Sequence, residues 1–130
     1  MIPVLDSSIL MNLEKGKTDF KKKISELSEK YDGEPVIAFM TYLEFLMGIK
    51  GRSKENQEKA RGFVNKFGIL KVNKETAEIL SELKYDLEKK GIALPLADLL
   101  IAAQVIENRM ILVTTDKDFE KIEELKKIIL

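Results

Sequence analysis

The sequence contains no cysteine and no histidine, and these two absences exclude several kinds of functional site. Without cysteine there is no thiol nucleophile, and without histidine there is no Ser-His-Asp triad and no paired-histidine ribonuclease chemistry. The usual zinc sites, which are built from these two residue types, are excluded as well. An enzyme of this composition has to work with carboxylates, lysine, arginine, serine, threonine and tyrosine, together with a hard metal ion.

The chain also lacks a long apolar run and an excess of charge of either sign. No apolar stretch is long enough to span a bilayer, and residues 1–6 lack the basic region of a signal peptide. We therefore expect a soluble cytoplasmic protein, with residues 1–130 forming one domain. The 22 basic and 22 acidic residues give a net charge of zero. This balance argues against a general nucleic-acid coating protein, although a local basic rim remains compatible with it.

Short apolar runs alternate with helical patterns along the chain, which predicts a parallel sheet with helices on both faces. The predicted strands are Ile2–Leu5, Val36–Phe39, Ile69–Val72 and Met110–Val113, followed by a last apolar run at Ile128–Leu130. The predicted helices are Ile9–Glu14, Thr18–Tyr31, a helix that Thr41 caps, Glu55–Phe67, Glu75–Lys90, Leu94–Ile106 and a short one around Glu120–Leu125. Gly68 is expected to end the helix before it, and Asn73 to cap the helix after it.

The stretch Leu94–Ile106 is apolar nearly all round, which is typical of a buried helix. It contains a single carboxylate, Asp98, and no lysine or arginine occurs from Ile92 through Ile106. A buried carboxylate is costly unless it is paired, hydrogen-bonded or bound to a metal ion. Two interpretations stay open on this stretch alone: Asp98 caps the N-terminus of the helix, or it holds a cation.

Three further acids follow predicted strands: Asp6 follows the first, Glu44 the second and Asp116 the fourth. The carboxyl ends of the strands form the edge at which open α/β sheets bind ligands. Each acid also has a structural interpretation, since Asp6 is a good N-cap and Glu44 completes a capping box with Thr41. The apolar neighbours of Glu44 place it, in this reading, on a largely buried helix.

Four carboxylates at one edge repel one another and raise each other's pKa, and divalent cations relieve that repulsion. Oxygen ligands without histidine or cysteine suit Mg²⁺ or Mn²⁺ rather than zinc, and such ions can grip a phosphate and activate water. Other phosphoryl chemistries fit less well. Neither a Walker A loop nor a Gly-x-Gly-x-x-Gly fingerprint is present, and Ser8 stands where an aspartyl-phosphate phosphatase would typically have a second aspartate.

Four segments, in order, carry a resemblance to a known family: Val4–Leu10, Thr41–Gly48, Leu96–Ala103 and Leu112–Phe119. They resemble the four motifs of PIN-domain proteins of the VapC type, the toxin ribonucleases of bacterial and archaeal toxin–antitoxin pairs. The third segment is the most specific, and the resemblance covers essentially the whole chain. Each motif alone is weak, but four in the right order within one domain of this length are a strong signal.

The resemblance implies a PIN-like three-layer α/β/α sandwich around a central, mainly parallel sheet of four to five strands. It also implies an endoribonuclease that depends on Mg²⁺, or on Mn²⁺ in its place, and that cleaves RNA phosphodiester bonds with a metal-activated water. By match, the catalytic and metal-binding acids are Asp6, Glu44, Asp98 and Asp116, with Asp6 and Asp98 as the principal ligands. The orienting residues are Ser7 or Ser8, and Thr114. Asp118 is either an additional acid or the cap of the short helix after it.

Members of this family commonly form homodimers and are neutralised by a cognate antitoxin, so both partners are expected here beside the RNA substrate. Four basic residues are candidate RNA contacts, although each fits a solvated surface position as well: Lys50, Arg52, Lys54 and Lys117. Five apolar residues are assigned to the core or to a dimer interface: Leu10, Leu13, Leu46, Met47 and Phe119.

Three rival functions remain open at this point. The chain could be a non-catalytic interaction module whose acids are caps and surface charges. It could also be a PIN-domain nuclease of RNA maturation or decay without an antitoxin, or a nuclease for structured DNA, since the PIN fold resembles flap nucleases. Convergence of Asp6, Glu44 and Asp98 on one place would separate the first of these rivals from a nuclease.

Overall fold

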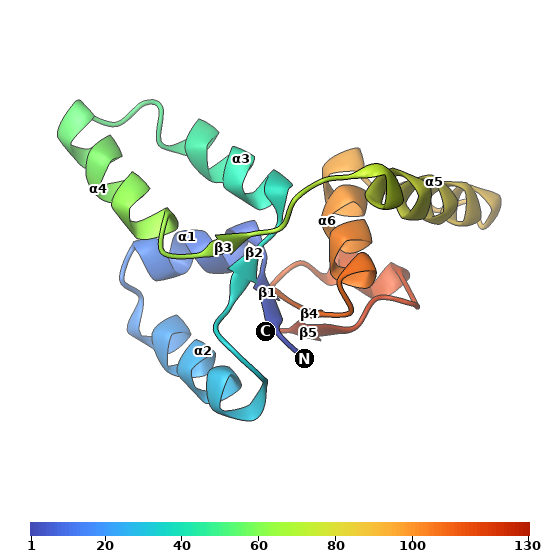
Figure 1. Cartoon of the computed structure of the whole chain (residues 1–130), viewed down its shortest axis with the longest axis horizontal. Helices are drawn as coiled ribbons and strands as arrows, with labels where there is room; N and C mark the ends of the chain where they lie inside the picture. The colour runs from blue at the N-terminus through green and yellow to red at the C-terminus, as the bar shows by residue number, and fades with distance from the viewer.

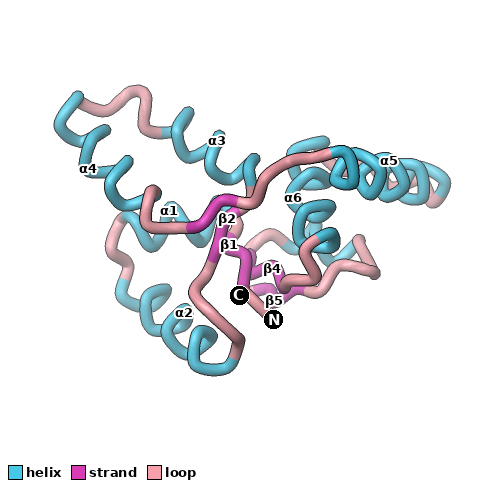
Figure 2. Tube along the Cα trace, viewed as in Figure 1, coloured by secondary structure: helices cyan, strands magenta, loops and turns pink.

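A computed structural model describes all 130 residues, and Figure 1 follows the chain from its N-terminus to its C-terminus. The strands are β1 (Pro3–Leu5), β2 (Val36–Ile37), β3 (Gly68–Ile69), β4 (Ile111–Thr114) and β5 (Lys127–Ile129). The helices are α1 (Ser7–Glu14), α2 (Thr18–Lys30), α3 (Phe39–Gly48), α4 (Lys54–Val64), α5 (Lys74–Lys89) and α6 (Leu96–Glu107), with a 3₁₀ helix η1 (Lys117–Lys121). Figure 2 shows how small a share of the chain the strands take.

The five strands form one sheet in the order β3-β2-β1-β4-β5, and every neighbouring pair is parallel. The central strand β1 pairs on both sides, with Val4 opposite Val36 of β2 and Leu112 of β4. Parallel neighbours need a crossover connection, and here helices supply most of these connections. The predicted parallel sheet of four to five strands is confirmed.

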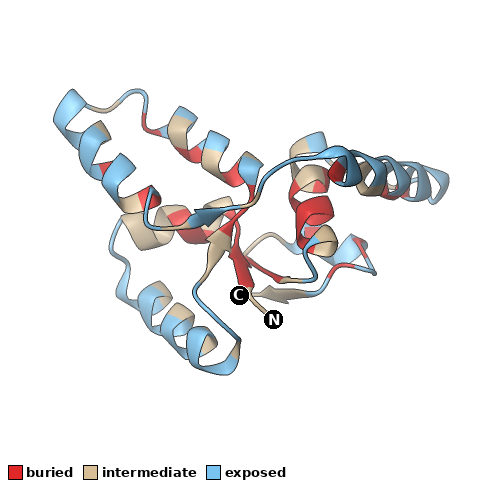
Figure 3. Ribbon diagram, in the orientation of Figure 1, coloured by how far each residue is buried: buried red, intermediate tan, exposed pale blue.

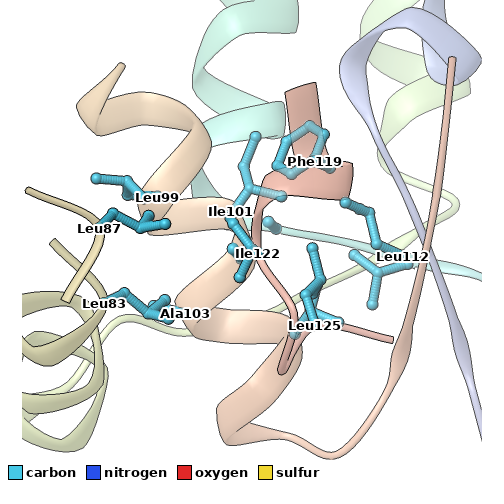
Figure 4. Packing of buried hydrophobic residues seen from close by; sticks show 13 residues of the cluster. Leu83, Leu87, Leu99, Ile101, Ala103, Leu112, Phe119, Ile122 and Leu125 are labelled. Carbon is cyan, nitrogen blue, oxygen red and sulfur yellow. The ribbon is translucent and has the colours of Figure 1, made fainter. Parts of the chain in front are cut away.

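Successive residues of each strand point to opposite faces of the sheet, and each face has its own apolar core. Val4 and Leu112 belong to the core under α5 and α6, while Leu5 and Val113 belong to the core under α1 to α4. Figure 4 shows the first core, in which α5, α6 and the segment after β4 pack together; the labelled residues are Leu83, Leu87, Leu99, Ile101, Ala103, Leu112, Phe119, Ile122 and Leu125. Helices on both faces confirm the three-layer α/β/α arrangement.

Buried residues gather on the central strands and on α6, whereas α2, α4 and α5 present exposed outer faces (Figure 3). Leu10 and Phe119 are buried, as predicted for core residues. None of the helices combines the length and the apolar character that crossing a membrane requires.

The middle strands are shorter than predicted. β2 ends at Ile37 instead of Phe39, because Phe39 already begins α3. β3 is Gly68–Ile69 instead of the predicted Ile69–Val72. The prediction that Gly68 ends the preceding helix is wrong, because α4 already ends at Val64 and a short turn follows. A Cβ at position 68 would lie 3.3 Å from the Val36 side chain. Glycine therefore allows β3 to approach β2 closely.

On the other face, α5 and η1 each begin at a local side-chain cap. The predicted cap at Asn73 is confirmed, since its side chain accepts from the Thr76 amide and forms a capping box with Thr76. The predicted short helix around Glu120–Leu125 is wrong. A 3₁₀ helix over Lys117–Lys121 takes its place, because Asp116 provides a cap and starts the turn earlier in the chain.

Candidate acidic site

The four predicted acids come from two strand ends and two helices at the carboxyl edge of the sheet. Asp6 directly follows β1, and its backbone amide donates to the Val113 carbonyl of β4 at 2.9 Å. Asp116 lies two residues beyond the end of β4, the strand that pairs with β1. Glu44 is on α3, which follows β2, and Asp98 is in the first turn of α6. The four acids therefore lie on segments that meet at this edge of the sheet.

Asp6 is the most buried of the four acids, with 7% of its surface exposed. The Thr114 hydroxyl donates to its Oδ2 at 2.6 Å. Burial raises the pKa of Asp6 above its ordinary value; hydrogen bonds from Thr114 and from the Ser7 amide lower it, and the charges of Glu44 and Asp116 raise it. Although Asp6 occupies the N-cap position of α1, it makes no usual capping hydrogen bond. Its carboxylate is held toward β4 rather than along the helix.

Asp98 is half-buried in the first turn of α6, but it is not the cap of that helix. Pro95 occupies the N-cap position and no side chain caps the helix, so the capping interpretation of Asp98 is wrong. Burial, followed by the charges of four other acids, raises the pKa of Asp98 to about 6; these acids are Asp116, Asp6, Glu44 and Asp118. Asp98 therefore lies within the combined negative field of the other acids.

Glu44 is exposed, and the Ser7 hydroxyl donates to its Oε1 at 2.7 Å. The predicted capping box with Thr41 is wrong, because α3 begins at Phe39 and leaves Thr41 buried inside the helix. The prediction that Glu44 lies on a largely buried helix is also wrong. Leu43 and Met47 are 37% and 64% exposed, since α3 packs only one face against the rest of the chain.

Asp116 is half-buried and is tied to Asp6 through a shared threonine. The Thr114 hydroxyl, which donates to Asp6, accepts from the Asp116 amide at 3.0 Å. The Asp116 carboxylate in turn accepts from the Asp118 amide at 2.9 Å and caps η1. Asp118 is therefore not the cap. It is exposed, lies 3.4 Å from the Lys121 ammonium, and its charge raises the pKa of Asp98 less than the charges of the other three acids do.

The two predicted orienting serines have different partners. Ser7 contacts Glu44, as described above, whereas Ser8 accepts from the Thr115 hydroxyl at 2.9 Å and contacts none of the four acids. Sequence reasoning missed a further polar residue, Gln104 of α6, which is fully buried and hydrogen-bonds to the first residue of α3. The only signal for it was one amide side chain inside the otherwise apolar run from Leu99 to Val105.

The four basic residues that were predicted to contact RNA differ in their exposure and in their ion pairs. Lys50, Lys54 and Lys117 are exposed. Arg52 is half-buried, and its guanidinium lies 2.6 Å from the Glu14 carboxylate at the end of α1. Arg52 therefore fastens the connection between α3 and α4 to α1.

As the side chains stand, no three acidic groups are close enough together to hold one metal ion. The donor set itself fits a hard divalent cation, because all four groups supply carboxylate oxygens. Coordination by three of them requires at least one side chain to move. Glu44 is free to do so on the surface, since it is exposed and a single hydroxyl holds it.

Comparison with known proteins identifies the family of the chain. A family model described as "PIN domain" matches residues 4–125. No curated protein matches the sequence significantly. Among solved structures, VapBC2 from Rickettsia felis, bound to a DNA fragment from its promoter, is 25% identical with a TM-score of 0.87, over 100% of this chain and 99% of that one.

VapBC-1 from nontypeable Haemophilus influenzae is also 25% identical, with a TM-score of 0.85 over 99% of this chain and 98% of that one. DNA-bound VapBC from Salmonella typhimurium shares the fold at 17% identity, with a TM-score of 0.84 over 99% and 98% of the two chains. The resemblance to PIN-domain proteins of the VapC type is thus confirmed. The match over nearly the whole length shows that the chain belongs to the PIN domain family.

Proposed function

We propose that this protein is the toxin of a VapBC-type pair, an endoribonuclease that cleaves RNA phosphodiester bonds with Mg²⁺, or with Mn²⁺ in its place. Membership of the PIN domain family supports a nuclease, and the VapBC neighbours support a VapC-like toxin with an antitoxin partner. As a toxin of this type, it would act on RNA in the cytoplasm.

One observation carries the proposal: the four acids come from segments that meet at the carboxyl edge of the sheet, where Thr114 bonds both to the Asp6 carboxylate and to the Asp116 amide. The raised pKa values of Asp6 and Asp98, to which the other acids contribute, agree with this arrangement. Caps and surface charges, as in an interaction module, would be placed apart from one another. Acids that are kept together at a cost need a function that requires their joint negative charge. Binding of a divalent cation is such a function, and the absence of histidine and cysteine favours Mg²⁺ or Mn²⁺.

Each residue has a distinct part in the proposed site. Asp6, fixed by Thr114, and Asp98 are the principal metal ligands, while Glu44 and Asp116 complete the site directly or through water. A bound divalent ion supplies two things, a nucleophilic water at neutral pH and stabilisation of the phosphate charge. The Ser7 hydroxyl holds the Glu44 carboxylate beside α1. Lys50, Lys54 and Lys117 are the proposed contacts to RNA phosphates.

The proposed protein partners are a cognate antitoxin and a second copy of this chain. The surface of α3 supports association, because Phe39, Leu43 and Met47 recur every four residues and are all exposed. An exposed apolar stripe of this kind on a helix marks an interaction surface. We propose that α3 serves self-association.

Cleavage of an end-labelled single-stranded RNA by the purified protein tests the proposed activity. The reaction is run with Mg²⁺, with Mn²⁺ and with chelator, and is repeated with Asp98→Asn and with Asp86→Asn. Asp86 is an exposed acid of α5 and serves as the matched control. We expect cleavage that needs the metal, survives Asp86→Asn and disappears in Asp98→Asn.

Equal activity in Asp98→Asn would reject the assigned site. A DNA strand of the same sequence, used in parallel, distinguishes a ribonuclease from a nuclease for structured DNA. Absence of both metal binding and cleavage would favour the interaction module.

A further inference from the structure

Gln104 is a fully buried amide side chain that joins three parts of the fold. It lies on α6, where its neighbours Ala103 and Val105 are apolar and buried. Its Oε1 accepts from the backbone amide of Phe39 at 2.9 Å, and its Nε2 donates to the carbonyl of Leu70 at 3.0 Å. Both ends of the side chain are therefore engaged, as a buried amide requires.

The hydrogen bond to the Phe39 amide caps the N-terminus of α3, which has no side-chain cap of its own. Phe39 is the first residue of α3, and the preceding residue, Ala38, has no side-chain group that could cap the helix. The first four amides of a helix have no partner within the helix. Gln104 satisfies one of them from another layer of the protein, 65 residues further along the chain.

The hydrogen bond to Leu70 connects Gln104 to the residue that follows β3. The Leu70 amide donates to the Ile37 carbonyl at the end of β2, and its own carbonyl accepts from Gln104. Gln104 thus fastens the end of β2, the beginning of α3 and the residue after β3 to α6.

We propose that Gln104 is a positioning residue that fixes the helix of Glu44 relative to the helix of Asp98. Glu44 lies five residues after Phe39 on α3, and Asp98 lies six residues before Gln104 on α6. Asp6 and Asp116 are already joined through Thr114, and Glu44 is joined to α1 through Ser7. The amide of Gln104 provides the connection between the two acid-bearing helices, and with it the spacing that cation binding requires. This inference rests on the proposed function.

Calorimetric titration of the whole protein with Mn²⁺ tests the inference without relying on activity. Gln104→Met preserves the volume and removes both hydrogen bonds. We expect Mn²⁺ to bind at least about tenfold more weakly, the effect typical of removing a residue that orients a metal ligand. Gln104→Glu keeps an acceptor for the Phe39 amide and is expected to bind Mn²⁺ more tightly than Gln104→Met does.

Thr76→Val is the matched control, because Thr76 is equally buried and its hydroxyl bonds to Glu107 of α6, away from the acids. We expect it to lower the unfolding temperature while leaving the Mn²⁺ affinity within about twofold of wild type, since a purely structural loss does not move the acids. If Gln104→Met does not fold, Gln104→Asn replaces it, since the shorter side chain cannot span Phe39 and Leu70.

The outcomes are distinguishable. Wild-type affinity in Gln104→Met, or an equal loss in Thr76→Val, would overturn the positioning role while leaving the proposed function intact. Failure of the wild-type protein itself to bind Mn²⁺ would overturn both. Binding that is lost in Asp98→Asn and weakened in Gln104→Met, with Thr76→Val unaffected, is the expected result.

Discussion

The two acid-bearing helices, α3 and α6, have similar apolar sequences but very different surroundings. Six residues of α6 are buried, whereas only Thr41 and Phe45 are buried on α3. In Figure 1, α6 lies between the sheet and α5, while α3 extends away from the sheet toward α4. An apolar helical pattern therefore predicts that other residues pack against the helix, but it does not indicate whether those residues belong to the same chain.

The difference extends to the acids that the helices carry. Asp98 is half-buried, and burial is the main reason for its raised pKa. Glu44 is exposed and has one hydroxyl partner. Asp98 is therefore the more buried member of the pair, and Glu44 is the more exposed one, held only by the Ser7 hydroxyl.

The largest expected effect is on the rate of RNA cleavage, which substitution of Asp98 should lower more than substitution of Glu44. Asp98→Asn should lower the rate of RNA cleavage by about 100- to 1,000-fold, the range found when one preorganised electrostatic contact is removed. Glu44→Gln should lower it by about tenfold, because water can replace an exposed ligand. Single-turnover kinetics with Mg²⁺ measure both rates. Equal losses in the two variants would contradict the distinction.

The second prediction compares the two helices in stability. Ile101→Ala on α6 should lower the free energy of unfolding by about 3 kcal/mol, since it leaves a cavity in a closed core. Met47→Ala on α3 should change it by less than about 0.5 kcal/mol in the monomer, because Met47 is largely exposed. Urea unfolding of both variants provides the values, and a large loss in Met47→Ala would show that α3 is covered after all.

The third prediction concerns what covers α3. Met47→Glu places a charge in the exposed apolar stripe and should weaken self-association by about tenfold or more, because a charge is costly in an apolar interface. Light scattering coupled to size-exclusion chromatography measures this, with Tyr85→Glu on the exposed surface of α5 as the control. A wild-type protein that is monomeric at all concentrations would reject the proposed homodimer.

The smallest effect concerns the charge of Asp98 without metal. Its pKa is raised from 3.8 to about 6 on folding, so the folded chain binds this proton more tightly than the unfolded chain. Stability should therefore fall as the pH rises from about 4 to 6, and Asp98→Asn should remove that part of the decline. At pH 7 the Asp98→Asn substitution should raise the free energy of unfolding by less than about 1 kcal/mol, because solvent screens a half-buried group. Thermal unfolding in chelator at several pH values tests this, and parallel curves for the two proteins would be inconsistent with it.

Sequence reasoning predicted the sheet, the two covering layers and the positions of Asp6 and Asp116 just after strands, because these follow from periodicity and from the ends of apolar runs. Val4 and Leu5 alternate between two cores, and Asp6 follows directly at the edge. Asn73 was identified as a cap because its signal is local. Patterns within a few residues were sufficient for each of these features.

The features that were missed depend on contacts between distant segments. Thr41 looked like a cap because the pattern Thr-x-x-Glu fits one, but Gln104, 65 residues beyond Phe39, satisfies the start of α3 two residues earlier. Arg52 was predicted as an RNA contact from its own loop, but its guanidinium is paired with Glu14 of α1. No local pattern contains either partner.

The most direct test of the central claim is the carboxyl pKa of Asp98, followed by ¹³C NMR with and without Mg²⁺. Without metal, the account predicts a pKa near 6, because burial and the neighbouring acids disfavour the charged form. With saturating Mg²⁺ the pKa should fall below the ordinary value for aspartate, since a bound cation favours the carboxylate. A pKa that stays near 6 in Mg²⁺ would contradict the claim that these acids form one cation site.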